Sequence, residues 1–124
     1  MTPVAHVGVD GCPAGWIAVR RIDGGDPRVA IHASFGELLT AYVDAVIAVD
    51  MPIGLPDFIG KGGRGPEQAV RPLLGARQSS VFSIPSRQSV YCADYRQGCA
   101  AALATSDPPR KISRQAFFLF GKIR

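Results

Sequence analysis

The chain has 124 residues, 47% of them hydrophobic and 19% charged, and its formal net charge is +4. This length suits one domain with a single core, and this composition excludes a disordered chain. No apolar run approaches the roughly 18–20 residues of a membrane span, and the first residues lack the basic and apolar segments of a secretion signal, so we expect a cytoplasmic protein that does not enter a membrane.

The charges and the cysteines are unevenly distributed. Residues 1–60 hold three Lys/Arg and seven Asp/Glu, whereas residues 61–124 hold eleven and three. This split fits an acidic metal-binding end beside a basic surface that attracts phosphates, and equally a basic face that is simply solvated. The three scattered cysteines argue against a disulfide framework and a zinc site, and favour small buried thiols.

The first third of the chain predicts an antiparallel meander. Residues 4–10 indicate a buried strand closed by Gly11 and Pro13, and residues 15–22 indicate a second strand. The turn between them is too short for a helix, so these strands are antiparallel neighbours. After the turn signal Asp23-Gly-Gly-Asp-Pro, residues 28–33 supply a third strand.

A helix and a fourth strand follow the meander. Ser34 and Glu37 form a capping-box pattern at the helix start. An apolar stripe then predicts one buried helix face, made of Phe35, Leu38, Leu39, Tyr42 and Val43. Residues 45–50 indicate a fourth strand, apolar at every position up to Asp50, which is typical of a parallel strand covered on both sides. A helical crossover places this strand parallel to the first one.

The second half of the chain predicts loops and helices. Residues 54–65 indicate a Gly-rich loop, and Pro66 suits the first turn of a short helix that runs to about Leu74. Residues 76–87 indicate a structured loop, and residues 88–104 a longer helix. One face of that helix would be formed by Tyr91, Tyr95, Cys99 and Ala102.

A last helix begins after Ser113, where Ile112 and Phe117 have the spacing of a hydrophobic staple. Its apolar residues need a surface to pack on, and no C-cap signal precedes Arg124. We therefore expect residues 1–124 to be one α/β domain that is truncated at its carboxyl end. Exposed side chains on the last helix would then favour a homo-oligomer, namely Phe117, Phe120 and Ile123.

Two aspartates are the leading candidates for chemistry. Asp10 and Asp50 each end a predicted central strand, and adjacent strands lie about 4.8 Å apart. Two carboxylates at neighbouring carboxyl ends can share one or two cations, and oxygen ligands without Cys or His favour Mg²⁺ or Mn²⁺. In two-metal phosphoryl chemistry such ions, about 3.5–4 Å apart, activate water and steady the leaving oxygen. An aspartate that caps a turn is the alternative.

Two further segments suit phosphate. Arginine and hydroxyl donors in residues 77–87 suit contacts to a phosphate backbone, and surface arginines beside a turn are the equal alternative; the donors are Arg77, Ser79, Ser80 and Arg87. The turn from Gly11 to Gly15 suggests a second mechanism, in which backbone amides cradle a nucleotide phosphate as in ATP-handling relatives. A tight connection is the plainer interpretation of that turn, because Cys12 and Pro13 stand where Ser or Thr is usual.

Four blocks of sequence resemble one protein family. They are Val-Gly-Val-Asp-Gly-Cys-Pro-Ala-Gly-Trp-Ile-Ala-Val (7–19), Ile-Ala-Val-Asp-Met-Pro-Ile-Gly-Leu-Pro (47–56), Leu-Gly-Ala-Arg-Gln-Ser-Ser-Val-Phe-Ser-Ile-Pro-Ser-Arg (74–87) and Ile-Ser-Arg-Gln-Ala (112–116). On these blocks the chain resembles the domain-of-unknown-function 429 family, regarded as predicted nucleases of the ribonuclease-H-like fold. The resemblance implies roles for Asp10, Asp50, Arg64, Arg71, Arg77, Ser79, Ser80 and Arg87.

The chain departs from the family at two places. Family members usually carry Cys-Asp where this chain has Pro66-Glu67, so the resemblance implies that Glu67 stands in as a third carboxylate. Family members also continue past Ile123 into an acidic segment, a strand and a helix, and ribonuclease-H-like enzymes draw further metal ligands from such late segments. The resemblance thus leaves two alternatives for this chain, an active hydrolase or a truncated form without activity.

The sequence therefore predicts a ribonuclease-H-like α/β domain, with a three-stranded meander, a helix, a parallel fourth strand and a helical carboxyl-terminal part. The leading function is a nuclease or phosphodiester hydrolase that uses water activated by Mg²⁺ or Mn²⁺, with nucleic acid or another phosphoester as its partner. The alternatives are an ATP-handling phosphotransferase relative and a non-catalytic domain that binds nucleic acid or a protein.

Overall fold

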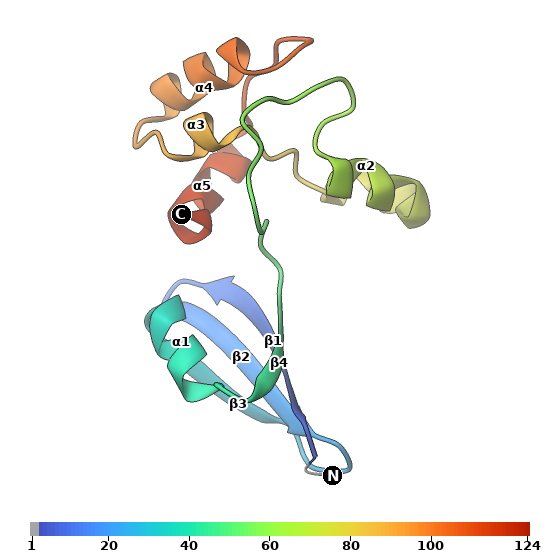
Figure 1. Ribbon diagram of the computed structural model, residues 1–124, viewed down its shortest axis with the longest axis vertical. Helices are drawn as coiled ribbons and strands as arrows, with labels where there is room; N and C mark the ends of the chain where they lie inside the picture. Colours follow the sequence, from blue (N-terminus) through green and yellow to red (C-terminus); the bar gives the residue numbers. More distant parts are fainter. Residues whose placement is uncertain (1–2) are drawn as a thin grey trace. The chain divides into compact units, whose positions relative to one another are not determined.

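The computed structural model describes residues 3–124, which divide into two compact units after Met51 (Figure 1). The chain is a mixed α/β protein with one four-stranded sheet in the first unit and only helices in the second, within the residues described. None of the helices described is long and apolar enough to cross a membrane.

The first unit has the order β-β-β-α-β that the sequence predicts. Its elements are β1 (Ala5–Cys12), β2 (Gly15–Ile22), β3 (Arg28–His32), α1 (Phe35–Ala41) and β4 (Ala45–Val49). The strands lie in the order β3-β2-β1-β4. The first three are antiparallel neighbours, and β4 is parallel to β1, which confirms both the meander and the crossover.

One face of this sheet forms the core of the first unit, and α1 lies over it (Figure 1). The cluster of buried residues is Val7, Val9, Trp16, Ala18 and Leu38. Side chains alternate along β4, so Ile47 packs against the core whereas Val46 is 56% exposed on the opposite face. The prediction that the fourth strand is covered on both sides is therefore wrong.

The start of α1 is as predicted, but its end is not. Ser34 Oγ accepts a hydrogen bond from the Glu37 amide at 3.1 Å, which confirms the Ser34 half of the capping box. The helix ends before Tyr42, whose backbone leaves helical geometry, so Val43 is exposed instead of joining a buried stripe, and Leu39 is exposed as well. Tyr42 still packs against the core and its hydroxyl hydrogen bonds the ring of His32 at 3.0 Å.

The second unit consists of short helices joined by loops. They are α2 (Gly65–Val70), the 3-10 helix η1 (Arg71–Ser80), α3 (Arg87–Val90), α4 (Tyr95–Ala104) and α5 (Arg114–Ile123). The predicted single helix over residues 88–104 is wrong. Asp94 accepts a hydrogen bond from the Gln97 amide at 3.0 Å and so starts a new helix in the middle of that stretch. The helix predicted from Pro66 to about Leu74 is α-helical only as far as Val70. The 3-10 helix η1 follows it directly, and Gly75 within η1 is not in helical geometry.

The last helix, α5, packs within the second unit. Ser113 caps it by accepting a hydrogen bond from the Ala116 amide at 3.1 Å, as predicted. Phe120 is fully buried in the core of this unit, and Phe117 and Ile123 pack against the same core. The prediction that these three side chains are exposed is therefore wrong, and the large apolar residue that α5 does expose is Phe118, at 75%.

Candidate functional site

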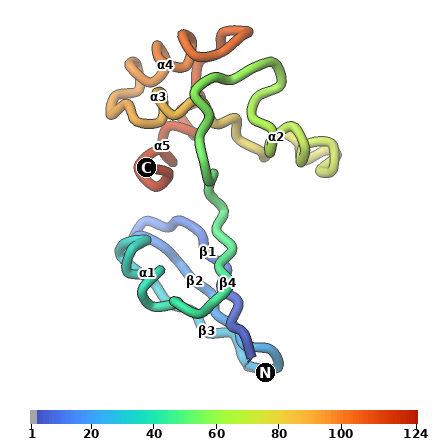
Figure 2. Tube along the Cα trace, in the orientation of Figure 1, coloured from blue at the N-terminus to red at the C-terminus, as the bar shows by residue number. Residues whose placement is uncertain are grey.

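The carboxyl ends of β1 and β4 bring Asp10 and Asp50 to neighbouring positions. The parallel register pairs Val9 with Val49, and the Asp50 amide donates to the Val9 carbonyl at 3.2 Å, so the ladder continues to the two aspartates. The traces of β1 and β4 run side by side (Figure 2). Neighbouring strands are about 4.8 Å apart, so the backbones of Asp10 and Asp50 are neighbours at the carboxyl ends of β1 and β4.

Both aspartates lie on the face of the sheet opposite to α1. Val7 and Val9 alternate with exposed residues along β1, and Val49 packs on the core side of β4, so Asp10 and Asp50 extend to the exposed face. One oxygen of Asp10, Oδ1, accepts a hydrogen bond from the Gly11 amide at 2.8 Å. Within residues 3–124 no group of three or more His, Cys, Asp or Glu is placed to hold a metal ion, so the described candidate site has two carboxylates.

The turn after β1 is a tight hairpin. Gly11 pairs with Trp16 and Cys12 with Gly15, so only Pro13 and Ala14 connect the strands. The Gly11 amide is already bonded to Asp10, and proline has no amide proton to donate. Gly15 has φ +135°, and a side chain there would collide with the carbonyl oxygen of His32. The absence of a side chain at Gly15 thus permits close packing of β2 against the end of β3.

A second polar cluster lies in the second unit, at the Gly-rich loop before α2. Arg64, at 8% exposed, forms an ion pair with Glu67, whose Oε1 lies 3.1 Å from its Nη1. Arg71 donates to the Gly62 carbonyl at 3.4 Å and to Ser83 Oγ at 2.7 Å. Gln68 donates to the Gly63 carbonyl at 2.6 Å, so the loop is held by side chains from α2 and η1.

Glu67 is a buried carboxyl with an incomplete set of partners. It is the third residue of α2 and accepts a hydrogen bond from the Arg64 backbone, as a helix-capping glutamate does. Burial raises the pKa of Glu67, and the nearby Arg64 and Arg71 charges offset only part of that effect. Its second oxygen, Oε2, has no hydrogen-bond partner in the described part of the chain. Glu67 is thus placed with two arginines in the second unit.

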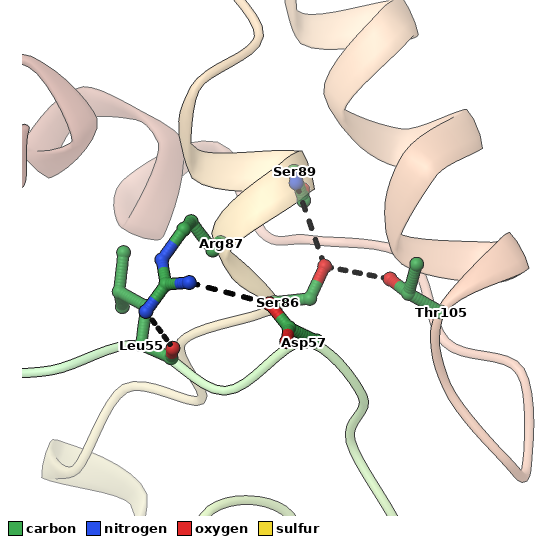
Figure 3. Close-up of polar contacts among 6 residues, drawn as sticks. All are labelled: Leu55, Asp57, Ser86, Arg87, Ser89 and Thr105. Atoms are coloured by element: carbon green, nitrogen blue, oxygen red, sulfur yellow. Dashed lines mark hydrogen bonds and ion pairs between the residues drawn. The ribbon is translucent and has the colours of Figure 1, made fainter.

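Arg87 is held by the first residues of the Gly-rich loop (Figure 3). Its Nη2 donates to the Leu55 carbonyl at 2.8 Å, and its Nη1 lies 3.4 Å from the Asp57 carboxylate. Both members of this ion pair are largely exposed, so the pair contributes little stability. The guanidinium positions residues 55–57 and keeps exposed donors.

The neighbouring Ser86 is fully buried and links two helices (Figure 3). Its hydroxyl accepts the Ser89 amide at 3.4 Å, which caps α3, and shares a hydrogen bond with Thr105 at 2.6 Å. Thr105 in turn donates to the Ala101 carbonyl in the last turn of α4. These contacts are all satisfied within the fold, so we assign them to structure.

The remaining predicted phosphate contacts lie on η1. Arg77, Ser79 and Ser80 are exposed on this segment, which buries no residue. The structure thus groups Arg64 and Arg71 at the Gly-rich loop and leaves Arg77, Ser79 and Ser80 in solvent. The sequence prediction missed Gln68 and Ser83, which hold the loop and Arg71. A usable signal for Gln68 was an amide side chain one turn after Arg64, within reach of the loop carbonyls.

Comparison with known proteins identifies a family but no characterised relative. Neither a curated protein nor a solved structure matches the chain. The model of the family described as "Protein of unknown function (DUF429)" matches residues 8–124, which include both aspartates and the whole second unit. The chain therefore belongs to the DUF429 family.

Proposed function

We propose that this chain is a metal-dependent nuclease or related phosphodiester hydrolase that uses metal-activated water. The observation that carries the proposal is the placement of Asp10 and Asp50 at adjacent carboxyl ends of two parallel strands, on one exposed face. Carboxylate oxygens suit Mg²⁺ or Mn²⁺, and such an ion lowers the pKa of bound water enough to supply a nucleophile.

The sheet supports a ribonuclease-H-like assignment of the domain. A meander of three strands, a helical crossover and a fourth strand parallel to the first give the order β3-β2-β1-β4. In this arrangement β1 is central and β4 is an edge strand, which corrects the expectation that both aspartates end central strands. The carboxyl ends of these two parallel strands lie on the same side of the sheet, which is where open α/β sheets usually bind their ligands. The proposed setting remains the cytoplasm, as the sequence predicts.

The proposed roles follow from charge. Asp10 and Asp50 bind the cation, and Glu67 is the proposed third carboxylate. The proposed contacts to substrate phosphates are donors of the second unit, of which Arg64 is buried and Arg71 half-buried; they are Arg64, Arg71, Arg77, Ser79, Ser80 and Arg87. The basic excess of this unit, eleven Lys/Arg against four Asp/Glu in residues 52–124, would attract a polyanion.

Calorimetric titration of the full chain with MgCl₂ and MnCl₂ tests the metal site. We expect Asp50→Asn to weaken cation binding at least tenfold, about 1.4 kcal/mol, because it removes one charged ligand. Asp10→Ser should act similarly while its hydroxyl can still accept the Gly11 amide. Asp44→Asn is the matched control, because Asp44 is an exposed aspartate before β4, at the other end of that strand.

Cleavage of labelled single-stranded DNA, duplex DNA and RNA with each metal then tests the chemistry. Loss of cleavage in the Asp10 and Asp50 variants, with the Asp44 control active, supports the proposal. The proposal is rejected if the wild-type chain binds neither cation and the aspartate variants match it in every assay.

A second candidate is a non-catalytic domain that binds nucleic acid. The charge of residues 52–124 favours it, because that excess of Lys/Arg needs no metal in order to attract phosphates. Steeply salt-dependent oligonucleotide binding, unchanged by Asp50→Asn and without cleavage in any metal, would select this candidate.

A further inference from the structure

The Gly-rich loop of the second unit borders an open cavity of about 380 Å³. Its walls are mostly apolar, from Ile53, Pro56, Phe58 and Ile59. The end of the loop contributes Gly63, Arg64 and Gly65. A volume of this size lies in the usual range for small-molecule sites, which combine apolar walls with a few fixed polar groups.

Arg64 is the charged side chain in the wall of this cavity. Its side chain is 7% exposed, so the guanidinium is held in place by the fold instead of moving in solvent. Among the described residues it has one ion-pair partner, Oε1 of Glu67, although a guanidinium carries five N–H donors. Arg71 adds a second positive charge near the same carboxyl, so the cluster of two arginines and one glutamate is cationic.

Two of the apolar side chains that line the cavity are unusually exposed to solvent. Ile53 and Phe58 both belong to the exposed large hydrophobic residues of the chain, yet both border the cavity. Apolar side chains that gather in solvent around a fixed polar group mark a ligand-binding surface.

We infer that this cavity binds a small organic anion, with its phosphate or carboxylate group at Arg64 and its apolar or aromatic part against Ile53, Phe58 and Ile59. Guanidinium groups bind both kinds of anion through paired hydrogen bonds. The site shares Arg64 and Glu67 with the proposed function, but it uses neither aspartate of the first unit and needs no cation. Anion binding in the absence of metal therefore tests it independently of the proposed hydrolysis.

Phenyl phosphate, benzoate and inorganic phosphate are suitable probes, titrated calorimetrically into the full chain with EDTA present. We expect phenyl phosphate to bind at least tenfold more tightly than inorganic phosphate, because only the ring reaches the apolar walls. The comparison with benzoate distinguishes a phosphate site from a carboxylate site. Asp50→Asn should leave all three affinities unchanged.

A pair of glycine variants separates cavity binding from general charge attraction. Gly65 borders the cavity and Gly60 does not. A Cβ atom added at either position meets no atom within 4 Å, and neither backbone is in the left-handed region, so we expect both methionine variants to fold. Gly65→Met narrows the cavity and should weaken phenyl phosphate binding at least tenfold, whereas Gly60→Met should not.

The Glu67→Gln variant should bind the anion more tightly, an effect that is not expected if Glu67 has only a structural role. Glu67 competes with the ligand for Arg64, and glutamine keeps the shape while removing the competing charge. We expect phenyl phosphate to bind about threefold more tightly or better to this variant. The inference is overturned by an absence of phenyl phosphate binding at millimolar concentration, or by equal affinities of the Gly65→Met and Gly60→Met variants.

Discussion

Replacement of Phe120 by alanine measures how far the second unit depends on α5. Phe120 is fully buried among Val90, Ala116 and the rest of that core, and its ring lies 5.4 Å from the Phe117 ring, centroid to centroid. Removal of a buried phenylalanine side chain costs roughly 3–5 kcal/mol, through lost burial and the remaining cavity. With a urea m-value of about 2 kcal/mol per M, the unfolding midpoint should fall by about 2 M.

The matched control is Phe118→Ala, two residues earlier on the same helix and 75% exposed. Surface substitutions usually change stability by about 0.5 kcal/mol or less, so its midpoint should stay near that of the wild type. Far-ultraviolet circular dichroism in urea follows the helices directly. Equal midpoints for the two alanine variants would refute the assigned packing of α5.

Two further predictions concern single residues. Gly15→Ala should destabilise the first unit by about 1–3 kcal/mol, because the φ of +135° at Gly15 and the nearby His32 carbonyl exclude a side chain. Gly8→Ala is the control and should be nearly neutral, because a Cβ atom at Gly8 meets no atom within 4 Å. Thermal unfolding compares the two variants. Burial raises the pKa of Glu67, so the folded chain holds this proton more tightly than the unfolded chain does. The contribution of this proton to stability is complete at acidic pH and is lost as the pH rises through the raised pKa of Glu67. The difference in unfolding free energy between the wild type and Glu67→Gln should therefore change only between the unfolded pKa of Glu67 and its raised folded pKa.

The first unit was predictable from sequence because its signals are local. Alternating apolar residues, a two-residue turn and the Ser34 cap each specify one element without reference to the rest of the chain. The parallel pairing of β1 and β4 then follows from the helical crossover, and with it the juxtaposition of Asp10 and Asp50.

The second unit was less predictable because long-range contacts decide it. Asp94 looks like any polar helix residue until its side chain is seen to cap a new helix. Gly98 lies where a side chain would press on Ile112, a contact that no local pattern announces. The buried pairing of Arg64 with Glu67 was missed because charged residues beside a Gly-rich loop are usually solvated.

The shared hydroxyl of Ser86 has a consequence for cooperativity. A helix of four residues such as α3 has too few internal bonds to persist by itself. Because one oxygen closes the start of α3 and also meets the residue that ends α4, loss of either end releases the other. Amide protons in both segments should therefore exchange through one common opening event, as a single foldon.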